Sequence, residues 1–125
     1  MSKVKLTPAN EDYLEAIFQL GGDSGPVRSV DVANKLGVSK ASVNRAVSNL
    51  KAVGFVTQQY YGDVNLTPTG MKYARGVLDR HHVLYHFLID NLGVKPEIAA
   101  QEACEMEHAI SDDTLKRWTA YIKSE

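Results

Sequence analysis

The chain has 125 residues, 44% of them hydrophobic and 23% charged, with a formal net charge of −1 at pH 7. This length allows one compact unit or two very small ones that share a core. No apolar run approaches the roughly 20 residues of a bilayer span, the N-terminus lacks the apolar core of a signal peptide, and one cysteine excludes an internal disulfide. We therefore expect a cytoplasmic protein with no membrane partner.

The small net charge hides an uneven distribution along the chain. Residues 26–54 carry five basic side chains and one acidic side chain, whereas residues 97–125 carry seven acidic and three basic side chains. A basic segment is thus joined to an acidic one. This asymmetry predicts different partners for the two ends of the chain.

A first helix is predicted from Thr7 to about Leu20. Thr7 supplies a hydroxyl at the N-cap and Pro8 stands at the first helical position, where proline is tolerated. Asp12 and Glu15 lie three residues apart on the flank of this helix. On an isolated helix they would face water and complement the helix dipole.

Two short helices are expected next, from Ser29 or Val30 to Leu36 and from Ser39 to about Val53, with a tight turn at Gly37. This pattern predicts a helix-turn-helix whose second helix presents short and polar residues at its start. Such residues can reach phosphates, base edges or a thymine methyl, and an arginine can bind guanine with two hydrogen bonds. The expected DNA contacts are Arg28, Ser39, Lys40, Ala41, Ser42, Asn44, Arg45, Tyr60 and Tyr61.

Alternation of apolar and polar residues over residues 54–67, with Gly62-Asp63 at the centre, predicts a β-hairpin with the two tyrosines near its tip. The hairpin would turn the helix-turn-helix into a winged helix. A helix-turn-helix used only for protein contact is the alternative. The local positive charge favours double-stranded DNA as the partner.

A long helix is predicted from Thr67-Pro68 to about Leu92. Its apolar face comprises Ala74, Leu78, His81, Tyr85, Leu88 and Leu92. A histidine in the middle of such a face must be hydrogen-bonded, neutral or bound to a ligand. His82 and His86 fall on the flank, and we interpret them as surface or interface residues.

The next helix, which begins after Lys95, gathers Cys104, Glu107 and His108 into one stripe beside an apolar face, while Glu102 and Glu105 face water. A thiol, a carboxylate and an imidazole together predict a metal site, although a half-buried cysteine beside a surface Glu-His pair also fits the pattern. Ser111 should cap a last helix whose inward residues are Leu115, Trp118 and Ile122.

The order of these parts, from Thr7-Pro-Ala-Asn-Glu-Asp-Tyr-Leu-Glu-Ala-Ile17 through the winged helix and Asp79-Arg-His81 to Glu102-Ala-Cys-Glu-Met-Glu-His108, resembles the diphtheria toxin repressor and manganese transport regulator family. The resemblance implies a homodimeric repressor that binds palindromic operators when Mn(II) or Fe(II) is abundant. It also implies six metal ligands: Asp12, Glu15, His81, Cys104, Glu107 and His108.

This chain combines features of two branches of that family. In the family that this chain resembles, the manganese branch has an acid at the position of Cys104. The iron branch has the cysteine but carries a methionine at the position of Asp12. The iron branch's second site requires a carboxylate and a histidine where this chain has Tyr85 and Ala100. We therefore expect that site to be absent, together with the SH3-like domain of longer members.

The expected architecture is mainly α: a winged helix-turn-helix domain with a small β-hairpin wing over residues 1–73, then a helical dimerisation and metal-binding domain over residues 74–125. The expected function is metal-dependent repression of metal-uptake genes, with no enzymatic activity and no organic substrate.

Two alternatives remain at this point. In one, a winged-helix regulator senses an organic ligand or thiol oxidation through Cys104. In the other, a small metallo-hydrolase uses the same cluster with an open coordination position. The hydrolase would need a nucleophile and a base beyond the metal ligands, and the sequence supplies neither.

Overall fold

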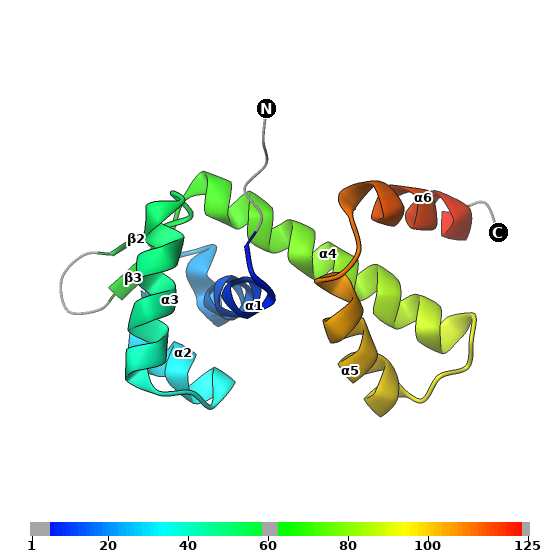
Figure 1. Cartoon of the computed structure of the whole chain (residues 1–125), viewed down its shortest axis with the longest axis horizontal. Coiled ribbons are helices and arrows are strands. Elements are labelled where there is room, and N and C mark those ends of the chain that lie inside the picture. The colour runs from blue at the N-terminus through cyan, green and yellow to red at the C-terminus, as the bar shows by residue number, and fades with distance from the viewer. Residues whose placement is uncertain (1–5, 59–62, 124–125) are drawn as a thin grey trace. The chain divides into compact units, whose positions relative to one another are not determined.

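A computed structural model describes residues 6–58 and 63–123 and divides the chain into two compact units (Figure 1). The first unit comprises residues 1–75 and the second residues 76–125, so the boundary falls within the long helix α4 (Pro68–Asp90). Within the described residues, no helix has both the length and the apolarity needed to cross a bilayer.

Three helices form the frame of the first unit: α1 (Pro8–Ile17), α2 (Ser29–Leu36) and α3 (Lys40–Ala52). Thr7 caps α1, because its hydroxyl oxygen accepts a hydrogen bond from the Asn10 amide at 3.2 Å. A π-helical turn, η1 (Phe18–Gly22), continues α1. The turn between α2 and α3 places Gly37 at φ 66°, a left-handed conformation that glycine adopts at no steric cost. The predicted helix-turn-helix is confirmed.

A three-stranded antiparallel sheet in the order β1-β3-β2 completes this unit, with strands β1 (Val27–Arg28), β2 (Val56–Gln58) and β3 (Asp63–Leu66). The hairpin of β2 and β3 is the expected wing. Two details differ from the prediction: β1 is an additional strand, and Asp63 begins β3 instead of lying in the turn. Tyr60 and Tyr61 lie outside the described residues.

The core of the first unit is mainly apolar and also contains a buried carboxylate that the sequence did not indicate. Leu14, Ile17 and Leu50 are among its fully buried side chains. Glu11, only 1% exposed, accepts a hydrogen bond from the Tyr73 hydroxyl at 2.6 Å. This hydrogen bond fixes α1 against the start of α4.

The start of α4 is tied to the segment that precedes the wing. The Thr67 hydroxyl donates to the Gly54 carbonyl at 2.7 Å and accepts from the Gly70 amide at 3.0 Å. Gly70 lies so close to this segment that a Cβ atom built on it would be 2.0 Å from the Phe55 carbonyl oxygen. Only glycine allows α4 to begin in this position.

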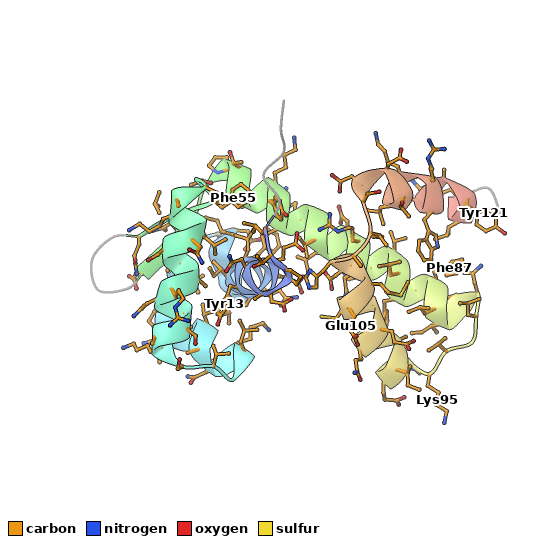
Figure 2. The ribbon with its side chains drawn as sticks, viewed as in Figure 1. Tyr13, Phe55, Phe87, Lys95, Glu105 and Tyr121 are labelled. Carbon is orange, nitrogen blue, oxygen red and sulfur yellow. The ribbon has the colours of Figure 1, made fainter. Side chains whose placement is uncertain are left out.

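The second unit contains the remainder of α4 with α5 (Pro96–Glu107) and α6 (Asp112–Lys123). Its buried apolar cluster joins α4 to α5 and comprises Leu84, Leu88, Ala99 and Ala103. Phe87 of α4, which Figure 2 labels, makes an edge-to-face contact with Trp118 of α6, with ring centroids 5.3 Å apart. The Ser111 hydroxyl caps α6 by accepting from the Thr114 amide at 3.1 Å.

The apolar face predicted for α4 is partly wrong. The helix ends at Asp90, two residues earlier than expected, because the Gly93 amide bonds back to the Ile89 carbonyl in a left-handed C-terminal turn. Leu92 is consequently 61% exposed. The fully buried positions include Val77 and Leu84, neither of which was predicted. The apolar residues predicted to point inward from α6 are only half-buried.

Two glycines of α4 provide a matched test of this packing. Gly70→Ala should destabilise the protein by about 1–3 kcal/mol, because the added methyl group meets the Phe55 carbonyl. Gly76→Ala should stabilise it by about 0.5–1 kcal/mol, because no atom lies within 4 Å of the added Cβ and alanine favours helix. Urea denaturation measures both changes, and equal effects at the two positions would contradict the close approach.

Candidate functional site

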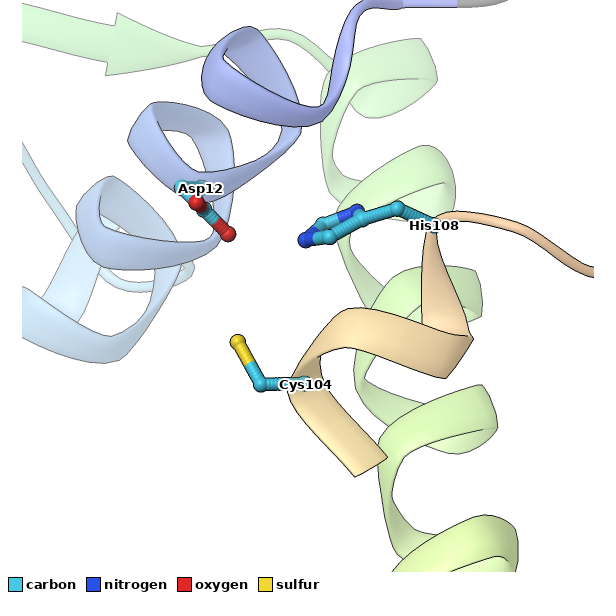
Figure 3. Close-up of side chains that lie close together, drawn as sticks. All are labelled: Asp12, Cys104 and His108. Atoms are coloured by element: carbon cyan, nitrogen blue, oxygen red, sulfur yellow. The ribbon is translucent and has the colours of Figure 1, made fainter. Parts of the chain in front are cut away.

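The stripe of donor groups predicted near the C-terminus lies at the end of α5. Glu107 is the last helical residue and is fully buried, while His108 caps the helix with α-helical backbone angles and thus continues the stripe. Figure 3 shows the Cys104 and His108 side chains projecting from this end of α5; it also draws Asp12, which belongs to α1 of the first unit. Glu102 and Glu105 are exposed, as predicted.

A histidine of α4 contacts this stripe. The Nδ1 atom of His81 lies 3.0 Å from Oε1 of Glu107, and the His81 side chain is 27% exposed. His81 also stacks on Tyr85, with ring centroids 6.0 Å apart. The second unit therefore brings four of the six predicted ligands onto two neighbouring helices.

The burial of Glu107 was missed in the sequence, although a signal for it was present. Glu107 follows the buried alanines Ala99 and Ala103 at intervals of four residues, which places all three on one helix face. A carboxylate on an apolar face requires a partner, and His81 supplies a partner from α4.

The spacing of the remaining donors fits a metal ion. Ligand atoms of Cys104 and His108 lie within 4.8 Å of each other. Two such donors on one ion, at about 2.3 Å for sulfur and 2.1 Å for nitrogen, are at most about 4.4 Å apart. The two donors are thus close enough to belong to one candidate metal site. Imidazole, carboxylate and thiolate groups are also the donor types that divalent transition metals accept.

Asp12 and Glu15 lie on α1 and are half-buried. Asp12 directly follows Glu11, and Glu15 lies about one helical turn after it. The hydrogen bond that Glu11 accepts from Tyr73 anchors this helix within the first unit. Both belong to the first unit, whereas the other four predicted ligands belong to the second.

The predicted DNA-contacting face of α3 is accessible. Lys40, Ala41, Asn44 and Arg45 are exposed. Ser48, which sequence reasoning omitted, is exposed on the same stripe, four residues after Asn44. The spacing of the other residues would have indicated it.

The serines at the start of α3, Ser39 and Ser42, also cap the helix. The Ser39 hydroxyl oxygen accepts from the Ser42 amide at 3.1 Å, and the same hydroxyl donates to the Ser42 hydroxyl oxygen at 2.9 Å. Each serine is thus engaged with the other. Their geometry holds the start of the helix in place.

Arg28 lies on β1 and is oriented by an acidic neighbour. Its Nε and Nη2 atoms donate to the two carboxylate oxygens of Asp31 at 3.2 and 3.1 Å. The hydrogen bond to Asp31 and the negative charge of Asp31 raise the pKa of Arg28 above its ordinary value. The charge of Asp63 raises this pKa to a smaller extent. Arg28 therefore remains a fixed positive charge at the edge of the winged helix.

The fold and the donor groups together define a class of DNA-binding proteins. In this class, a winged helix is joined to a helical unit that carries potential metal ligands. Comparison with known proteins refines this class. Residues 5–64 match the family described as "Iron dependent repressor, N-terminal DNA binding domain". Residues 67–124 match the family described as "Iron dependent repressor, metal binding and dimerisation domain".

Individual relatives agree with these matches. The transcriptional regulator MntR of Salmonella typhimurium is 40% identical over 113 residues, which cover 90% of this chain and 71% of that protein. An uncharacterised HTH-type transcriptional regulator of Methanocaldococcus jannaschii is 32% identical, with coverage of 90% and 91%. The solved structure of the manganese regulator SloR has a TM-score of 0.81 and 26% identity, with coverage of 96% of this chain and 56% of that one.

The chain therefore belongs to the iron-dependent repressor family, the diphtheria toxin repressor and manganese transport regulator family of metal-dependent transcriptional regulators. The family expected from the sequence is confirmed. Its members are regulators and not enzymes.

Proposed function

We propose that this protein is a cytoplasmic, homodimeric repressor that binds palindromic operators of metal-uptake genes when Mn(II) or Fe(II) is bound. The observation that carries the proposal is the convergence of thiol, carboxylate and imidazole groups at the end of α5, in a chain that begins with a winged helix. The proposed domains are residues 1–73 for DNA binding and residues 74–125 for dimerisation and metal binding.

We assign the metal to six ligands: Asp12, Glu15, His81, Cys104, Glu107 and His108. A bound divalent ion supplies a positive charge that donors from several helices share. His81 and Glu107 already lie within hydrogen-bond distance of each other, so part of the ligand set is preorganised. The thiol must lose its proton to bind, so metal affinity should fall at acid pH.

The donor types restrict the choice of ion without deciding it. The carboxylates of Asp12, Glu15 and Glu107 suit Mn(II) and Fe(II), whereas the Cys104 thiolate favours softer ions. Co(II), Ni(II) and Zn(II) would bind the same donors more tightly in vitro, so affinity alone does not identify the cellular ion.

For DNA, we assign base reading to Ala41, Asn44 and Arg45 and phosphate contact to Arg28 and Lys40. All five side chains are exposed, on α3 and β1, and are therefore accessible to DNA. Ser39 and Ser42 fix the start of α3, as their mutual hydrogen bonds indicate. Tyr60 and Tyr61 are assigned to the phosphate backbone from their place in the wing sequence alone.

Metal would act as a clamp in this proposal. Asp12 and Glu15 belong to the first unit and the other four ligands to the second, so one shared ion restrains both units. The two recognition helices of a dimer must lie about 34–36 Å apart, or a multiple of that, to enter successive major grooves. Linkage then requires that operator DNA tighten metal binding by the same factor.

The first test is an anaerobic selection of binding sites from a random double-stranded DNA pool, in parallel with Mn(II), with Fe(II) and with a chelator. We expect a palindrome to be enriched only when metal is present, and the metal that supports enrichment is the preferred ion. Enrichment of the same palindrome in the presence of chelator would leave DNA binding intact and overturn the metal clamp.

Two glutamates of α5 provide a matched pair for the metal site. Metal should tighten operator binding about 5- to 150-fold, the range of a coupling free energy of about 1–3 kcal/mol. Glu107→Gln should abolish this increase, and Glu102→Gln, at an exposed position, should preserve it. Fluorescence anisotropy of the selected operator measures both variants, and a normal metal response in Glu107→Gln would refute the ligand assignment.

The DNA assignment predicts two kinds of loss. Asn44→Ala should cost about 1–3 kcal/mol on the selected operator and relax the base preference at one position. Lys40→Ala should weaken binding to all sequences alike and reduce the salt dependence of log K by about 0.9. Titrations at several salt concentrations separate these effects, and an unchanged base preference in Asn44→Ala would contradict its role.

A further inference from the structure

One face of α4 carries four donor groups that the site above does not use. Asp79, His82, His86 and Asp90 are all exposed. Their spacings of three, four and four residues place them in a single stripe along the helix. The stripe belongs to the second unit and lies on one rigid element.

The two histidines of this stripe face each other. Their ring centroids are 6.2 Å apart and the ring planes are only 14° from parallel. Within residues 6–58 and 63–123, neither imidazole takes part in a hydrogen bond or an ion pair. Both rings are therefore available to a ligand, unlike His81, which contacts Glu107.

The donor types of the stripe select a class of ion. Histidines four residues apart on a helix can share one metal ion, as in helical zinc sites, with metal–nitrogen distances of about 2.0–2.1 Å. Exposure leaves both side chains the freedom to reach this geometry. Imidazole nitrogens suit Zn(II), Ni(II) and Cu(II), whereas Mn(II) prefers oxygen donors.

We propose that His82 and His86 form a second metal site, selective for Zn(II) or Ni(II) over Mn(II), with water completing the coordination. Asp79 and Asp90 lie at the two ends of the histidine pair, where their negative charges favour a divalent cation. The site shares no donor with the six ligands assigned above, so it does not depend on the proposed function. The protein should therefore bind more Zn(II) or Ni(II) ions per subunit than Mn(II) ions.

The test is to count Zn(II) and Mn(II) ions per subunit in the whole 125-residue chain by competition with a chromogenic chelator. The wild-type protein should bind one more Zn(II) than His82→Ala/His86→Ala. The matched control is Lys72→His/His86→Ala, which keeps four histidines but separates the exposed pair by ten residues; it should also lack the extra ion. Mn(II) binding should be the same in all three proteins.

A third variant separates this proposal from the proposed function. Cys104→Ser/His108→Ala should keep the α4 ion, and in this variant Zn(II) should still shift the imidazole NMR signals of His82 and His86. Equal Zn(II) binding by the wild-type and His82→Ala/His86→Ala proteins would overturn the site. Restored binding in the Lys72→His control would also overturn it, because the spacing would then be irrelevant. Circular dichroism confirms that each variant is folded.

Discussion

The arrangement of the second unit depends on a buried carboxylate. Glu107 has no exposed surface, and burial of a charged group is costly unless it is paired and hydrogen-bonded. The imidazole of His81, 26 residues earlier, lies 3.0 Å away. This contact joins α4 to the end of α5. It has a preferred direction, whereas the apolar contacts of Ala99 and Ala103 have none. The positions of Cys104 and His108 follow from it.

The first unit uses a similar device. Glu11 is almost completely buried, and its hydrogen bond to Tyr73 anchors α1 to the start of α4. Asp12 follows Glu11 directly, just as His108 follows Glu107. In both units, a buried carboxylate thus immediately precedes a proposed metal ligand. Each ligand is carried by backbone that is already held in place within its own unit, which reduces the conformational entropy lost on binding.

Local features of the fold were predictable from the sequence, and nonlocal ones were not. The caps at Thr7 and Ser111 were recognised because a cap depends on residues within one turn. Strand β1 was missed because a two-residue strand exists only through its pairing with β3. The Cys104, Glu107 and His108 stripe followed from helical periodicity, but the pairing of Glu107 with His81 required the packing of α5 on α4. Periodicity cannot assign Asp12 and Glu15 to the same ligand set, and that assignment came from the family resemblance.

The contact between α4 and α6 gives the protein a built-in optical reporter. The chain has a single tryptophan, Trp118, and its indole packs edge-to-face on Phe87 while remaining half-buried. Because the first unit has no tryptophan, indole emission arises entirely from the second unit. Separation of α6 from α4 would hydrate the indole and shift its emission to longer wavelength. Fluorescence of the unlabelled protein therefore follows the docking of its last helix without interference from the DNA-binding half.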